Sequence, residues 1–311
     1  MSSPATKLAP PSWRILAATA TGATHTSGGW PHQDAVGSRP TPGQDAVVPP
    51  LVVAVADGHG HPRHFRSARG ARLAIEVACD VGHEAGALLA TAAGPEAVFA
   101  AVRDSIVPRL VGEWRERVAT DLATLPVTGP ELAASGAEPD QADLIAYGST
   151  LLVAIVAGDY IGLAQIGDGD VIAIGPDGDT WQPVPGDAGL DGYHTTSLCQ
   201  EDPEGSFRGG VIEWPRRPVA ALALCTDGYG NAQATDPWQP AFGADLARLL
   251  HERGSDWVAE ELPRWVALCA SAEGSGDDAT VALLLGPDRL TPLPAQDGGT
   301  TAAAGSRPAA G

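Results

Sequence analysis

Three aspartates, each followed by glycine, stand at the ends of apolar segments of the chain. They are Asp57 in the segment 51–60, Asp168 in the segment 160–170 and Asp227 in the segment 220–229. An acidic pair, Asp277-Asp278, precedes a further apolar segment, and Asp34 begins a short one. Strand ends hold side chains on a rigid frame, and glycine lets water or backbone approach closely. Because carboxylate oxygens suit Mg²⁺ or Mn²⁺, the pattern predicts a metal site.

An Asp-Gly dipeptide is also an ordinary turn signal, so each motif alone is ambiguous. Asp177-Gly178 and Asp191-Gly192 are flanked by polar, proline- and glycine-rich segments, and we interpret them as turns. The three motifs above differ because each follows an apolar run.

The elements that must position these residues follow from the hydrophobic pattern. Apolar or alternating runs predict strands at residues 13–20, 33–36, 51–56, 149–156, 160–166, 171–175, 220–225 and 279–285. Helices are expected from Ser67 towards Ala92, from Pro95 to about Leu122 with a kink at Pro108, and at 242–253 and 256–272. Separate runs of strands and helix pairs favour an α+β fold.

The remaining segments are expected to be loops or tails. Residues 24–29, which contain glycine and serine, are expected to separate the first two strands, and residues 126–143 are interpreted as a long surface loop because they are rich in proline, glycine, alanine and acidic residues. We predict one catalytic domain over residues 13–288, with a disordered N-terminus at 1–12 and a disordered tail at 289–311.

Composition excludes several classes of function. A net charge of −19 argues against a nucleic-acid partner, which requires a basic face. No apolar run is long enough to cross a membrane, and residues 1–11 lack the apolar region expected of a signal peptide, so we expect a cytoplasmic protein. No cysteine is followed by the spacing to arginine that cysteine-dependent phosphatases use, and no Gly-Lys-Ser/Thr motif supports a kinase or GTPase.

Taken in order, six short motifs resemble those of the metal-dependent protein phosphatases of the protein phosphatase 2C type. They are Gln33-Asp34-Ala35, Val55-Ala56-Asp57-Gly58-His59-Gly60, Gly148-Ser149-Thr150, Gly167-Asp168-Gly169-Asp170, Thr226-Asp227-Gly228 and Asp277-Asp278-Ala279-Thr280-Val281. The resemblance runs from about Trp13 to Leu285 and looks like a divergent bacterial branch of the family.

This resemblance implies a four-layer α/β/β/α sandwich of two antiparallel sheets flanked by helix pairs. It also implies a site that binds two Mg²⁺ or Mn²⁺ ions, or three if a further metal site is filled. The implied reaction is hydrolysis of phosphoserine or phosphothreonine by a metal-activated water. Carried over by position, Asp57 would bridge the two ions, the Gly58 carbonyl would bind one of them, and Asp227 and Asp277 would bind the other. Asp34 would hold metal-bound water, and Asp168 would bind a third ion. His59 would act as general acid.

Two positions depart from the family pattern. Gln33 replaces a carboxylate, and Gly29 stands where a phosphate-binding arginine is expected. We therefore predict that Arg63 or Arg66, in the basic segment after Asp57, binds substrate phosphate, with His25 and His32 as the next candidates.

Two other functions remain open at this stage. The domain could be a catalytically weak module that binds a phosphoprotein or kinase, or a metal-dependent hydrolase of a small phosphoester. The leading hypothesis implies a phosphoprotein substrate and, as an option, a cognate Ser/Thr kinase. Metal-dependent turnover of phosphopeptides and of small phosphoesters would separate the three.

Overall fold

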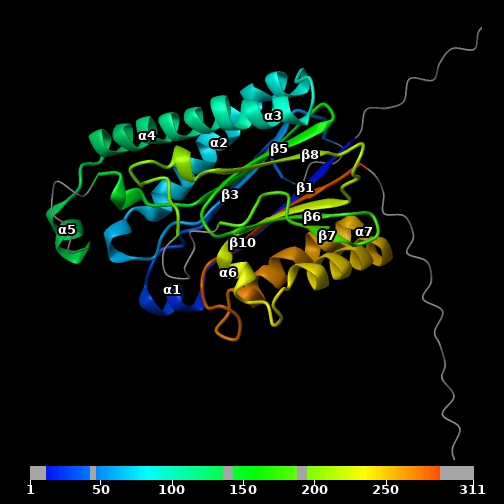
Figure 1. The fold of residues 1–311 in the computed structure, drawn as a ribbon. Coiled ribbons are helices and arrows are strands. Elements are labelled where there is room, and N and C mark those ends of the chain that lie inside the picture. The colour runs from blue at the N-terminus through cyan, green and yellow to red at the C-terminus, as the bar shows by residue number, and fades with distance from the viewer. Residues whose placement is uncertain (1–11, 43–46, 136–142, 188–194, 288–311) are drawn as a thin grey trace, which may run out of the picture.

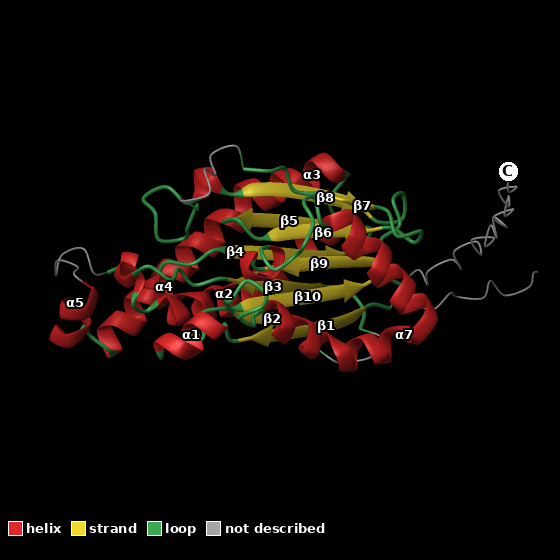
Figure 2. Ribbon diagram, turned by 90° about the horizontal axis from the view of Figure 1, so that it is seen from below, coloured by secondary structure: helices red, strands yellow, loops and turns green. Residues whose placement is uncertain are grey.

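Two five-stranded antiparallel sheets stack face to face at the centre of the molecule (Figures 1 and 2). The computed structural model describes residues 12–42, 47–135, 143–187 and 195–287. The first sheet contains, in spatial order, β1 (Arg14–Ala20), β10 (Ala279–Leu285), β9 (Ala221–Cys225), β6 (Asp170–Ile174) and β7 (Thr180–Trp181). The second contains β2 (Ala35–Arg39), β3 (Leu51–Ala56), β4 (Leu151–Ala157), β5 (Tyr160–Ile166) and β8 (Arg208–Glu213).

Helices cover the outer face of each sheet (Figure 1). The helices are α1 (Ala23–Gly28), α2 (Ser67–Ala90), α3 (Pro95–Ala101), α4 (Val107–Thr124), α5 (Gly129–Ser135), α6 (Asp227–Gly230) and α7 (Gln239–Cys269). Helices α2, α3 and α4 lie over the second sheet, and α7 lies over the first. The predicted α+β fold, a four-layer sandwich of two antiparallel sheets flanked by helix pairs, is confirmed.

The continuous apolar run of β3 is explained by burial on both of its faces. Val52, Ala54 and Ala56 pack under the helices, whereas Leu51 and Val53 face the other sheet. Each fully buried aliphatic side chain stabilises such a core by about 1.5–3 kcal/mol. The strand is therefore a rigid support for whatever its carboxyl end carries.

Proline 108 is accommodated without a break between α3 and α4. A single π-helical turn, Val102–Ile106, joins the two helices just before Pro108, which occupies the first turn of α4. A proline has no N–H to donate, and a first turn does not require one. The kink expected at this residue thus takes the form of a local change of helix type.

Three expectations from the sequence differ from the structure. Residues 24–29 fall largely in α1, the 126–143 segment contains α5, and β7 and β8 lie in a stretch without clear pattern. Helix α1 is held by tertiary bonds, from the Ala23 N–H to the Ala270 carbonyl and from the Thr24 N–H to the Gly276 carbonyl. Strand β8 contains Gly209 and Gly210, so its apolar alternation is weak.

The C-terminal helix pair is present as predicted. Helix α7 is interrupted at Gly254, whose φ of 84° is left-handed, and Pro263 lies within its second half. Asp177-Gly178 forms the expected turn, with the Gly175 N–H bonded to the Asp179 carbonyl. The predicted terminal tails and the Asp191-Gly192 turn lie outside the described residues, apart from Ser12.

Within the described ranges, no helix is both long and apolar enough to cross a membrane.

Candidate metal centre

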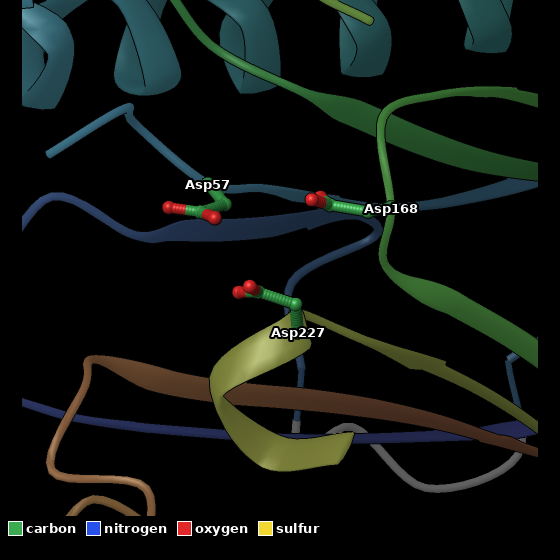
Figure 3. Close-up of side chains that lie close together, drawn as sticks. All are labelled: Asp57, Asp168 and Asp227. Atoms are coloured by element: carbon green, nitrogen blue, oxygen red, sulfur yellow. The ribbon is translucent and has the colours of Figure 1, made fainter. Parts of the chain in front are cut away.

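The three Asp-Gly motifs converge at one end of the sheets. Asp57 follows β3, Asp168 lies between β5 and β6, and Asp227 opens α6 shortly after β9. Figure 3 shows the three side chains around a common space, and one oxygen of each lies within 4.8 Å of the others. Strands of both sheets thus contribute carboxylates to a single cluster.

Close packing of the motifs on one another fixes Asp57 and Gly58. The Asp57 N–H donates to the Thr150 hydroxyl at 2.9 Å, and the Thr150 N–H donates to the Asp57 carbonyl at 2.8 Å. A Cβ on Gly58 would lie 2.8 Å from the carbonyl oxygens of Gln33 and Ser67. Any side chain at this position would therefore push the loop out of place.

Burial and mutual repulsion raise the pKa values of the clustered carboxylates. The pKa of Asp57 lies well above its ordinary range because the group is buried and faces other carboxylates, those of Asp34, Asp227, Asp277 and Asp168. Burial, followed by Asp168 and Asp277, raises the pKa of Asp227 to about 7. A bound divalent cation would reverse this repulsion, and hard oxygen ligands match Mg²⁺ and Mn²⁺.

Asp34 offers a buried oxygen that has no protein partner among the described residues. Its side chain accepts a hydrogen bond from the Thr226 hydroxyl through Oδ2 at 2.9 Å, whereas Oδ1 is unpaired. Burial raises the pKa of Asp34 to about 6. An orphaned buried oxygen beside an acidic cluster fits a cation or its bound water, so the donor set suits the predicted metals.

The acidic pair divides its roles between exposed and buried positions. Asp277 is exposed and lies outside the three-carboxylate cluster, although its charge raises the pKa of Asp57 and Asp227. Asp278 is buried and accepts hydrogen bonds from the Gly22 N–H at 2.7 Å and the Gln33 N–H at 2.6 Å. Asp278 therefore ties the first motif to the last, a structural role that the sequence analysis missed.

Both histidines proposed as reserve phosphate anchors are engaged elsewhere. His25 lies 3.2 Å from Asp277 and 3.0 Å from Asp278, and it is buried. His32 lies 3.3 Å from Asp278 and 2.7 Å from the Thr19 hydroxyl. Burial alone would lower the pKa of His32, but contact with Asp278 outweighs this effect and raises the pKa. These contacts assign both side chains to support of the acidic pair.

Gln33, which replaces a carboxylate of the family pattern, links two loops of the site. Its Nε2 donates to the Ser67 hydroxyl at 2.6 Å and to the His59 carbonyl at 3.3 Å. Its Oε1 is buried without a hydrogen-bond partner among the described residues. The amide therefore positions the loop after Asp57 and leaves one acceptor unused.

His59 follows Asp57 by two residues but is not part of the three-carboxylate cluster. Its ring packs edge-on against that of His64, with centroids 4.9 Å apart. Burial, with a smaller effect of His64, lowers the pKa of His59 to about 4, so the imidazole is neutral at pH 7. Its general-acid role stays a prediction.

The prediction that Arg66 binds substrate phosphate is not supported by its surroundings. The side chain is buried, and its five N–H donors reach Glu131, Tyr147 and the carbonyls of Leu125 and Pro126. A guanidinium has only five such donors, so none remains for a ligand. No local sequence pattern signals this pairing, because Glu131 is 65 positions away along the chain. Arg63 is exposed, and its guanidinium has no hydrogen bond or ion pair within the described part of the chain.

We expect Arg66→Ala to lower the free energy of unfolding by about 2–3 kcal/mol, because Glu131 and two carbonyls would lose a buried partner. The KM for para-nitrophenyl phosphate should not change. Urea denaturation and steady-state kinetics would measure both quantities, with the exposed Arg264→Ala as control. A higher KM at unchanged stability would return Arg66 to the list of phosphate ligands.

A second arginine near the cluster was missed for lack of a motif. Arg208, at the start of β8, is partly buried and donates to the Gly167 carbonyl and, at 2.9 Å, to the Pro185 carbonyl. Burial lowers the pKa of Arg208, opposed by the charges of Asp187 and Asp168. Arg208 thus positions the turn that carries Asp168.

Fold and site together define an α+β sandwich domain with an acidic cluster at one end of its two sheets. The family profile of protein phosphatase 2C matches residues 21–267, so the chain belongs to that family.

Solved structures of bacterial phosphatases share this fold at low sequence identity. A bacterial serine phosphatase superimposes with a TM-score of 0.54 at 14% identity, covering 88% of this chain and 98% of that one. PppA, a regulatory component of the T6SS in Pseudomonas aeruginosa, gives 0.52 at 15% identity with the same coverage. Stp1 from Staphylococcus aureus gives 0.50 at 14% identity and covers 92% of this chain and 99% of its own. The comparison with curated proteins finds no match.

Proposed function

We propose that this protein hydrolyses phosphoserine and phosphothreonine in protein substrates, in a reaction that depends on Mg²⁺ or Mn²⁺. The observation that carries the proposal is the convergence of Asp57, Asp168 and Asp227 within 4.8 Å. Bound divalent ions supply an activated water and neutralise the phosphoryl oxygens. Membership of the phosphatase family supports the same reaction class.

The residues of the site would have three roles: binding metal ions, orienting water and protonating the leaving group. Asp57, Asp227 and Asp277 would hold two ions together with the Gly58 carbonyl, and Asp168 would hold a third. Asp34, with its unpaired buried oxygen, would orient water beside them. His59 would donate a hydrogen bond to the departing serine or threonine oxygen, which needs a proton as the phosphorus–oxygen bond breaks.

A metal titration tests this proposal directly. We expect EDTA to abolish hydrolysis of a phosphothreonine peptide, and Mn²⁺ or Mg²⁺ to restore it while raising the melting temperature, because cation binding relieves carboxylate repulsion in the folded state. Turnover that survives EDTA and dialysis would contradict the metal site. Stabilisation by metal without turnover would instead indicate a phosphoprotein-binding module. Turnover of small phosphoesters alone would redirect the substrate assignment.

A further inference from the structure

One segment of the chain has a charge opposite to that of the molecule as a whole. Residues 58–75 contain four arginines and three histidines and no acidic residue, whereas the net charge of the protein is −19. The arginines are Arg63, Arg66, Arg69 and Arg72. The segment follows Asp57 directly, and because Glu131 and Asp121 pair with Arg66 and Arg69, its uncompensated positive charge is that of Arg63 and Arg72.

Three of these arginines recur at a spacing of three residues along the start of α2. Arg66 pairs with Glu131, and Arg69 pairs with Asp121. A cation near a helix N-terminus is unfavourable unless an anion compensates it, and these two acids do so. Arg72 is exposed and, within the described part of the chain, makes no hydrogen bond or ion pair. Of these three arginines, Arg72 is therefore the one without an acidic partner among the described residues.

Arg72 lines an open groove of about 680 Å³. The groove has a largely apolar wall made of Pro31, Phe65, Ala68, Leu125 and Pro126. Leu125 on this wall is 46% exposed. An apolar wall that is open to solvent beside a cavity indicates a surface that binds another molecule.

The groove opens beside the candidate metal centre. Ala68 follows Ser67, whose backbone packs against Gly58, and Pro31 lies two residues before Gln33. The far wall is formed by the segment between α4 and α5, which the Arg66–Glu131 pair holds in place. Both views place α1 and α5 at the same end of the sandwich (Figures 1 and 2). A polypeptide lying in the groove would thus pass close to Asp57.

We propose that this groove binds the substrate segment next to the phosphorylated residue, with an apolar side chain against Phe65 and Leu125 and an acidic side chain on Arg72. The assignment rests on the proposed phosphatase function and names its substrate class: phosphoproteins with acidic residues near the phosphosite. Charge complementarity selects this occupant, because an acidic peptide is repelled by most of the molecule and attracted here.

The test compares two phosphothreonine peptides that differ only in acidic or basic flanking residues. We expect the wild-type protein to show a KM about three- to fivefold lower for the acidic peptide, as for one exposed ion pair, and to lose this preference in about 0.5 M salt. Arg72→Gln should remove the preference, and Arg72→Glu should reverse it. Para-nitrophenyl phosphate turnover should not change in either variant, because it has no flanking residues.

Arg264→Gln on α7, which carries the same charge change at an exposed site, is the matched control and should leave the peptide preference intact. Equal KM values for both peptides in the wild-type protein would overturn the groove assignment while leaving the phosphatase proposal standing. Altered oligomeric state in Arg72→Gln at an unchanged KM would also overturn it, and would assign the groove to contacts between copies. Absence of turnover on every substrate would refute the phosphatase function itself.

Discussion

Asp227→Asn is expected to abolish metal-dependent phosphatase activity while leaving the fold intact. The substitution keeps the side-chain volume and removes one of the three converging carboxylates. A neutral amide is a poor ligand for a divalent cation in a site built from charged oxygens, so metal affinity and turnover should fall together. We expect activity below about one-thousandth of the wild-type value, an effect typical of losing an electrostatic group at the reacting centre.

The metal-free variant should be more stable than the metal-free wild-type protein at pH 8. Folding raises the pKa of Asp227 to about 7, so the folded state holds a proton that the unfolded state releases. Stability from this group is present below the unfolded pKa of about 4 and is lost as pH rises through about 7. The Asp227→Asn variant would be free of that loss, which predicts a melting temperature higher by about 3–6 °C.

Calorimetry in EDTA and isothermal titration with Mn²⁺ would measure these effects. Asp159→Asn, an exposed aspartate in the turn between β4 and β5, is a matched control and should change neither quantity. If Asp227→Asn retained wild-type turnover, the binuclear assignment could not stand. A less stable metal-free variant would show that Asp227 has a structural role not explained by repulsion.

The sheets were predictable because their strands are continuous apolar runs. Strands β3 and β4 are buried on both faces, so every residue in them is apolar and the sequence shows a continuous apolar run. Strand β8 shows no such apolar run because two glycines interrupt it and because, among the described strands, only β5 pairs with it. Helix α1 is short and depends on tertiary hydrogen bonds, which local propensity does not encode.

The candidate site was predictable to the extent that its residues carry local signals. Asp57, Asp168 and Asp227 each end an apolar run and precede glycine, and the structure brings them together. The pairing of Arg66 with Glu131 carries no local signal, because it depends on how α5 packs against the segment that precedes α2. Long-range polar contacts of this kind cannot be inferred from local sequence patterns.

The glycines of these motifs do more than admit water or metal. A side chain on Gly228 would collide with the Asp278 carbonyl, and one on Gly58 would collide with the backbone of Gln33 and Ser67. The motifs are therefore packed against one another as well as directed at a common space. Such packing explains how carboxylates that repel each other can be held within 4.8 Å.

His59→Gln is expected to reduce kcat for a phosphothreonine peptide by roughly 10²-fold and to affect para-nitrophenyl phosphate much less. A threonine alkoxide needs a proton as it leaves, whereas nitrophenolate is stable without one. His59 is neutral at pH 7 because its pKa is about 4, but a neutral imidazole still carries one N–H donor. The low pKa places the expected loss at the lower end of the range for general-acid catalysis.

Steady-state kinetics on both substrates would make the comparison, with His83→Gln, an exposed position on α2, as the matched control. The ratio of the two losses is the informative quantity, because a misplaced metal ligand would slow both substrates alike. Equal losses would assign His59 to positioning, consistent with the bond from its backbone N–H to the Gly148 carbonyl and its packing on His64. A selective loss on the peptide would indicate a proton donor at the leaving oxygen and would support the assignment of His59 to that role.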